Sequence, residues 1–294
     1  MGKPIDFICV GTQKAGTTTL HDVLKKHPNI YLPERKEAHF FDMDERFDKG
    51  LDWWMGTFFQ GDKTNKKTGV FTPEYLYLQN VPERIKNTLG DGLKVIVILR
   101  QPTKRAYSHY LMSKRRGFET EDFKYALQKE SYRLKENTYF NSNHFSYLDR
   151  GLYYNQLKRY IDTFGKENVK VFIFENDIIK NIESTLKTIQ EFIHVPYEVL
   201  ETAIKSNQAS EPKLKWLRSI IFNKNNPVKK LFSHLLLKED FKFKVASKIN
   251  AINQKPTKSD KLTSQEIQKI TNTYFIEDIK KVEQLLNIDL SLWK

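Results

Sequence analysis

The 294-residue sequence has one cysteine, Cys9, so it cannot form an internal disulfide, which favours a reducing compartment. It has no apolar run close to the ~20 residues that cross a bilayer, and the apolar stretch from Phe7 to Val10 is too short for a signal peptide. It also has no Asn-x-Ser/Thr glycosylation sequon. These absences predict a cytoplasmic protein without a stable membrane anchor.

Metal-binding and nucleic-acid-binding motifs are missing as well. The seven histidines show no metal-ligand spacing, and a single cysteine cannot form a zinc thiolate site, so we expect no metal. No recognisable RNA-binding motif is present, so we expect no nucleic-acid partner. The sequence does not indicate an oligomeric state.

Positive charge is what the sequence has in excess. There are 49 Lys and Arg residues against 36 Asp and Glu residues, which gives a net charge of +13. This balance suits anionic partners such as phosphates, sulfates or acidic glycans. A solvated lysine-rich surface would give the same charge, so charge alone identifies no partner. Hydrophobic residues make up 39% and aromatic residues 13%, which indicates a folded chain.

Strand and helix patterns alternate through the first two thirds of the chain. The residues from Leu93 to Leu99 are almost all aliphatic, which is typical of a strand covered on both faces. Further strands are predicted at 5–10, 30–32, 69–78 (interrupted by Pro73) and 169–174, and helices at 17–26, 102–116, 153–164 and 178–193. This alternation predicts an α/β fold in which helices flank a central parallel β-sheet.

The chain is predicted to form a single domain over residues 1–294. Its core spans 5–193, and a lysine-rich part follows at 205–262, where three prolines favour helical excursions and mobile loops. The C-terminal part, 264–294, begins with an amphipathic helix from Ser264 to Leu286, capped by Thr263 or Ser264. We expect loops at 44–67, 120–150 and 205–262 to select the substrate.

An anion-binding loop is predicted where the first strand meets the first helix. The residues from Gly11 to Thr18 read GTQKAGTT, and backbone amides at such a helix start converge on a phosphate. The Gly-x4-Gly spacing matches a P-loop, but Thr17 holds the usual lysine position and the loop's lysine is Lys14. The strand that could supply a magnesium-binding Asp ends in Leu99 and Arg100 instead. We therefore predict phosphate binding without a metal. A P-loop small-molecule kinase is the alternative, which a Mg²⁺ requirement would favour.

A second phosphate site is predicted at Arg100 and Ser108. Arg100 follows the central strand, at the sheet edge where open α/β sheets bind ligands. Ser108 lies about two turns into the next helix, and an arginine with a hydroxyl suits a separate phosphate. The alternative is that Arg100 forms only a surface ion pair.

In these motifs and several others, the sequence resembles the PAPS-dependent sulfotransferases, in particular soluble bacterial-type members of the carbohydrate (heparan sulfate-type) branch. The resemblance covers most of the chain in the family's order. The matching blocks are 7–18, 36–42 (KEAHFFD), 72–76 (TPEYL), 99–108, 151–157 and 285–293.

The resemblance implies a sulfotransferase fold related to P-loop nucleotide hydrolases and a reaction in which PAPS is the donor and PAP the product. It implies that a hydroxyl, or an amine, of a carbohydrate, glycolipid or small-molecule acceptor attacks the sulfuryl group in line. It implies that Lys14 stabilises the leaving phosphate, and that Arg100 and Ser108 hold the 3′-phosphate. The residues that would cradle the 5′-phosphate are Lys14, Ala15, Gly16, Thr17, Thr18 and Thr19.

Glu37 matches the position of the family's catalytic base. In an extended segment His39 would face the same side as Glu37, so it could assist the base or position the acceptor. The alternative is that Glu37 is one charge in a solvated run, while His39 packs against the neighbouring phenylalanines. The sequence departs from the family at Phe71, where several members have a lysine. From a different class, the chain could be a non-catalytic module that binds an anionic polymer.

Overall fold

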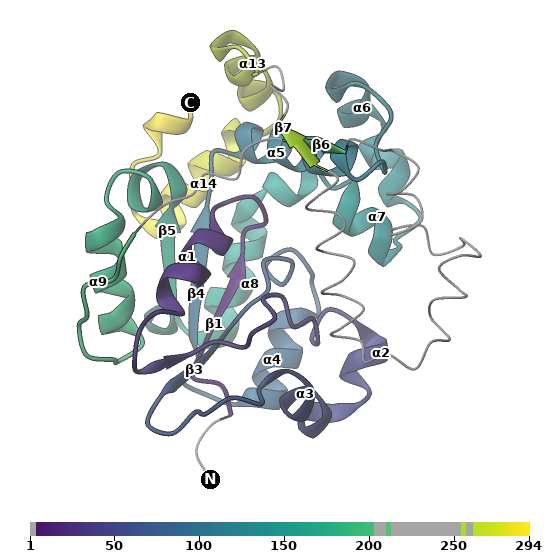
Figure 1. Cartoon of the computed structure of the whole chain (residues 1–294). Helices are drawn as coiled ribbons and strands as arrows, with labels where there is room; N and C mark the ends of the chain where they lie inside the picture. The colour runs from purple at the N-terminus through teal and green to yellow at the C-terminus, as the bar shows by residue number, and fades with distance from the viewer. Residues whose placement is uncertain (1–3, 203–209, 213–253, 257–260) are drawn as a thin grey trace. The chain divides into compact units, whose positions relative to one another are not determined.

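The computed structural model describes residues 4–202, 210–212, 254–256 and 261–294 (Figure 1). The chain divides into two compact units. Unit 1 comprises residues 1–106, 148–205 and 267–294, and unit 2 comprises 107–147 and 206–266. Among the described helices, none has both the length and the apolarity needed to cross a membrane.

Unit 1 contains a five-stranded sheet in the order β2-β3-β1-β4-β5. Every neighbouring pair is parallel, which confirms the predicted architecture. The strands are β1 (Phe7–Gly11), β2 (Ile30–Tyr31), β3 (Lys67–Phe71), β4 (Lys94–Leu99) and β5 (Val169–Ile173). The carboxyl ends of β1, β3 and β4 therefore lie next to one another, at the sheet edge where ligands bind in such folds.

Helices cover both faces of this sheet (Figure 1). Val95 and Val97 of β4 pack in one apolar cluster, and Ile96 and Ile98 pack in a second cluster on the opposite face, because side chains alternate along a strand. The second cluster includes side chains of α1 (Thr17–Leu24) and α9 (Ile182–Phe192). The first includes side chains of α3 (Gly50–Phe58), α4 (Val81–Leu89), α8 (Tyr153–Phe164) and α14 (Ile276–Leu286).

The remaining described elements of unit 1 are short. They are α2 (Asp44–Phe47), η1 (Asp149–Gly151), η2 (Lys166–Asn168), the π-helical turn η3 (Phe174–Ile178) and η4 (Ser291–Trp293). The helix predicted at 178–193 begins only at Ile182, because η3 occupies the start of that segment.

The predicted helix from Ser264 to Leu286 was wrong in one respect: it is two helices, α13 (Ser264–Tyr274) and α14. The break is at Phe275, whose buried ring packs so closely on Gly151 that a Cβ there would lie 2.8 Å from it. Thr263 is the cap of α13, since its Oγ1 accepts from the Glu266 amide at 3.2 Å. The Glu266 carboxylate accepts in turn from the Thr263 amide at 2.8 Å, which completes a capping box.

The loops predicted at 44–67 and 120–150 were also wrong in part, because both segments contain helices. The first holds α2 and α3, and the second holds α6 (Phe123–Leu134) and α7 (Tyr139–His144). Most of 205–262 lies outside the described residues. Its described parts, β6 (Ser210–Pro212) and β7 (Gln254–Pro256), form an antiparallel pair.

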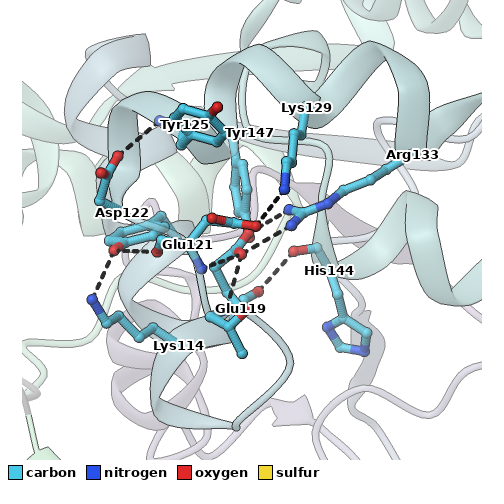
Figure 2. Close-up of polar contacts among 12 residues, drawn as sticks. Lys114, Glu119, Glu121, Asp122, Tyr125, Lys129, Arg133, His144 and Tyr147 are labelled. Atoms are coloured by element: carbon cyan, nitrogen blue, oxygen red, sulfur yellow. Dashed lines mark hydrogen bonds and ion pairs between the residues drawn. The ribbon is translucent and has the colours of Figure 1, made fainter.

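Unit 2 is organised around a buried carboxylate, Glu119, which follows the helix α5 (Pro102–Arg115). Arg133 of α6 binds both Glu119 oxygens, at 2.5 and 3.0 Å, and the Tyr147 hydroxyl donates to Oε2 at 2.9 Å (Figure 2). Burial alone would raise the pKa of Glu119, but these donors and the Glu121 amide lower it.

We expect unit 2 to lose stability in acid because of this network. Because the pKa of Glu119 is lower in the folded state, the ionised carboxylate stabilises the fold at pH values above the pKa of an unfolded glutamate. This stabilisation is lost as the pH falls through the lowered pKa. Arg133→Met, which removes the cation but leaves the Tyr147 hydroxyl and the backbone amides as donors to the buried carboxylate, should cost at most ~3–5 kcal/mol. Hydrogen exchange of α6 and α7 at pH 7 and pH 4 measures both effects. Equal exchange in the variant and the parent protein would contradict the prediction.

Candidate active site

The loop between β1 and α1 ends in an open helix N-terminus. Gly16 is the N-cap residue, with φ of 82°, and no side chain caps the helix. The amides of Thr17, Thr18 and Thr19 form the first turn, where backbone donors lack partners within the helix. The loop is closed internally by the Ala15 amide, which donates to the Thr12 carbonyl at 3.1 Å. This geometry suits a phosphate or sulfate group.

Arg100 reaches this loop from the end of β4. Its Nη1 donates to the Lys14 carbonyl at 2.8 Å, and its guanidinium lies 4.9 Å from the ring centroid of Phe174. The Tyr153 hydroxyl donates to the Arg100 carbonyl at 2.7 Å. Among the described residues, the Nε of Arg100 has no hydrogen-bond partner and the side chain forms no ion pair. Burial lowers the pKa of Arg100, although a guanidinium stays charged at any working pH.

Ser108 lies on α5 in unit 2, whereas Arg100 belongs to unit 1. All the other residues predicted for the site belong to unit 1.

Glu37 and His39 lie next to the end of β3. The Glu37 amide donates to the Phe71 carbonyl at 2.9 Å, and the Lys36 ammonium donates to Glu37 Oε1 at 2.7 Å. His39 Nδ1 donates to Asp42 Oδ2 at 2.6 Å. Burial by itself would lower the pKa of His39, but Asp42, Glu74 and Glu37 together raise it. The shift extends the protonated form of His39 to a higher pH than usual, and a protonated imidazolium cannot accept a proton.

Glu74 is a further carboxyl group in this cluster, and the sequence analysis did not include it among the site residues. One carboxylate oxygen of Glu37, one of Glu74 and a ring nitrogen of His39 all lie within 4.8 Å of one another. Gln13, in the anion loop, donates from Nε2 to Glu74 Oε1 at 3.1 Å. This hydrogen bond joins the anion loop to the acidic cluster. Because Lys36 already supplies a cation at Glu37, we interpret the cluster as a proton-transfer site.

Lys14 and Glu37 share an unusual backbone conformation. Six non-glycine residues in the described part of the chain have positive φ. Four of them are Asn or His, which tolerate this region. The other two are Lys14, at 74°, and Glu37, at 64°. Such conformations cost of order 1–3 kcal/mol and cluster at functional sites. One atom each of Glu37 and His39 lie within 4.8 Å of one another, but the backbone at Glu37 has positive φ and is not extended there as predicted.

Phe71, the predicted departure from the family pattern, is buried against apolar and aromatic groups. Its ring packs edge-on against His21, 5.4 Å away, and against Phe7, 6.4 Å away. The cation next to Glu37 comes from Lys36, whose side chain is 14% exposed. The Glu37 side chain is 39% exposed, so this charge run is only partly solvated.

Three residues of the site were missed by the sequence analysis: Gln13, Lys36 and Glu74. One signal for Glu74 was available, because it follows a strand that neighbours β1, and the ends of adjacent parallel strands meet at one edge. Gln13 and Lys36 carried no signal besides their position next to Lys14 and Glu37.

Comparison with known proteins gives consistent matches. The family model for the sulfotransferase domain matches residues 4–274. Human heparan sulfate glucosamine 3-O-sulfotransferase 5 is 28% identical over 223 residues, which are 74% of this chain and 61% of that protein. The bifunctional heparan sulfate N-deacetylase/N-sulfotransferase 1 of Caenorhabditis briggsae is 26% identical over 210 residues, which are 68% of this chain and 24% of that protein. The chain thus spans less than two thirds of these relatives.

A solved structure agrees with the sequence matches. The sulfotransferase from Alicyclobacillus acidocaldarius has a TM-score of 0.68 and 25% identity, and the match covers 98% of each chain. The fold, the anion loop and the extent of the family match lead to one conclusion: the chain belongs to the sulfotransferase domain family.

Proposed function

We propose that the protein transfers a sulfuryl group from PAPS to a hydroxyl or amine of a carbohydrate, glycolipid or small-molecule acceptor. The observation that carries the proposal is the hydrogen bond from Gln13 to Glu74. It holds the anion loop and the acidic cluster, which includes the proposed base Glu37, together in unit 1, as group transfer to an alcohol requires. The relatives are named for O- and for N-sulfation, so the proposal includes both acceptor atoms. It treats residues 1–294 as one sulfotransferase domain, since the family match extends over both units.

The residues present fit the donor. The open start of α1 and the orphaned Nε of Arg100 are unused donors at one loop. Residues 14–19 would hold the 5′-phosphosulfate, and Arg100 would hold the 3′-phosphate. For Ser108 the proposed contact with the 3′-phosphate rests on its family position alone. When bound, PAPS supplies the sulfuryl group and a phosphate leaving group.

Three side chains have defined tasks in the proposed mechanism. Lys14 stabilises the negative charge that develops on the leaving oxygen. Glu37 accepts the proton of the attacking group. His39, protonated and held by Asp42, positions the acceptor and offsets the negative charge of the cluster.

Calorimetric titration with PAP, in parallel with ATP and with and without EDTA, tests the donor site. Micromolar PAP binding that is independent of metal and lost in Arg100→Ala supports the proposal. Binding of ATP with Mg²⁺ in place of PAP would support a P-loop kinase. Binding of neither nucleotide would leave the anionic-polymer module as the function. A panel of oligosaccharides, glycolipids and amino sugars with labelled PAPS then identifies the acceptor.

Gly16→Ala is expected to weaken PAP binding by about tenfold or more. The φ of 82° strains any side chain there, at a cost of roughly 1–2 kcal/mol. The added Cβ would also lie 2.7 Å from the Phe174 ring that supports Arg100. Gly56→Ala is the matched control, since Gly56 lies in α3 with nothing within 4 Å of a Cβ. If both variants bind PAP as the parent does, the loop is not the donor site.

A further inference from the structure

Glu74 is a buried titratable group that the proposed mechanism leaves without a task. Its side chain is 7% exposed. Oε1 accepts from Gln13 Nε2, whereas Oε2 is buried and has no hydrogen-bond partner among the described residues. An ionised carboxylate is costly in such a place, because burial removes water and one oxygen is left without a donor. A protonated carboxyl group avoids the larger of these costs, because it carries no charge.

The groups around Glu74 shift its pKa in opposite directions. Burial raises the pKa of Glu74, and repulsion from Glu37 and Asp42 raises it further. The positive charges of His39 and Arg150 lower it. The net effect is a raised pKa of Glu74. Two neighbouring carboxyl groups commonly settle in this way, with one ionised and the other protonated.

We propose that Glu37 and Glu74 work as a pair with one proton, in which Glu74 is the neutral acid and Glu37 the ionised base. This inference rests on the proposed function. The pair then carries one negative charge beside the anion loop, so it repels an anionic sulfuryl donor less than two carboxylates would. On transfer, the acceptor proton goes to Glu37, and the pair becomes neutral. Glu74 is a positioning residue in this scheme, since it keeps its proton throughout.

Infrared spectroscopy tests the protonation of Glu74 without any acceptor. Protein with ¹³C-labelled glutamate should show a protonated-carboxyl band at pH 7.5, and this band should be absent in Glu74→Gln. Glu37→Gln removes the negative charge that raises the pKa of Glu74. In this variant the Glu74 band should therefore disappear at a lower pH than in the parent protein. Absence of the band in the folded parent protein would overturn the proposal.

The pH profile of sulfuryl transfer tests the role of the proton. With labelled PAPS and an unsulfated heparosan oligosaccharide as the probe, or the acceptor found in the panel, kcat should rise as Glu37 ionises and fall as Glu74 loses its proton. Glu74→Gln mimics the neutral acid but cannot ionise, so its kcat should no longer fall at alkaline pH. Glu74→Asp, which can still ionise, should retain that fall.

Two outcomes would contradict this role. An unchanged alkaline fall in Glu74→Gln would show that another group titrates. A loss in Glu74→Gln as large as that in Glu37→Gln, with PAP binding and thermal stability intact, would make Glu74 itself the base. PAP titration separates these results from failure of the proposed function, because neither substitution removes a phosphate-binding group. If PAP does not bind the parent protein, the donor site is wrong whatever the state of Glu74.

Discussion

Lys14→Met should lower kcat for sulfuryl transfer by ~10²–10³-fold while changing PAP affinity much less. Lys14 is the lysine of the anion loop, and its carbonyl is held by Arg100 at 2.8 Å. A cation that meets charge developing on the leaving oxygen stabilises the transition state more than the bound ground state. The effect therefore belongs mainly in kcat. Initial rates with labelled PAPS and calorimetric titration with PAP separate the two quantities.

Two further variants make the Lys14 experiment specific. Lys25→Met is the matched control, because Lys25 directly follows α1 and pairs with Glu34, whose side chain is 85% exposed. It should leave kcat within about twofold, since exposed ion pairs contribute little. Lys14→Arg keeps the charge and should retain part of the activity. If Lys14→Met lowered PAP affinity and left kcat unchanged, Lys14 would bind the donor without stabilising the leaving group.

Glu37→Gln should lower kcat by ~10²–10⁴-fold, the usual contribution of a general base. The substitution keeps the size of the side chain and removes only its ability to accept a proton. Glu37 acts only when ionised, so the parent protein should gain activity with rising pH, and the variant should lack this rise. The measurement is kcat as a function of pH, with PAP affinity as a check on the donor site.

The control for Glu37 comes from the same charge run. Glu34→Gln changes an exposed carboxylate three residues earlier and should not alter the pH profile. His39→Asn addresses the alternative base. It should lower activity at all pH values and keep the rise with pH, because His39 is proposed to position the acceptor. Loss of the rise in His39→Asn, together with its retention in Glu37→Gln, would reverse the two roles.

Local sequence was sufficient to predict the sheet and the anion loop. The aliphatic run of β4 is typical of a strand covered on both faces. Gly11 and Gly16 bracket a turn between a strand and a helix, and only such a turn presents several amides to one anion. Arg100 followed from the same reasoning, because it directly succeeds β4 in the chain. These features are determined by residues that are adjacent in the sequence, so the order of residue types is enough to predict them.

The composition of the acidic cluster was decided only by the tertiary structure. Gln13 and Glu74 are 61 residues apart in the chain, and they meet because β1 and β3 are paired in the sheet. The start of α8 is a similar case, since Asp278 of α14 accepts from the Tyr153 amide at 2.6 Å across 125 residues. The break at Phe275 likewise depends on close packing against Gly151. Such contacts depend on which strands and helices pack together, and hydrophobic periodicity does not contain that information.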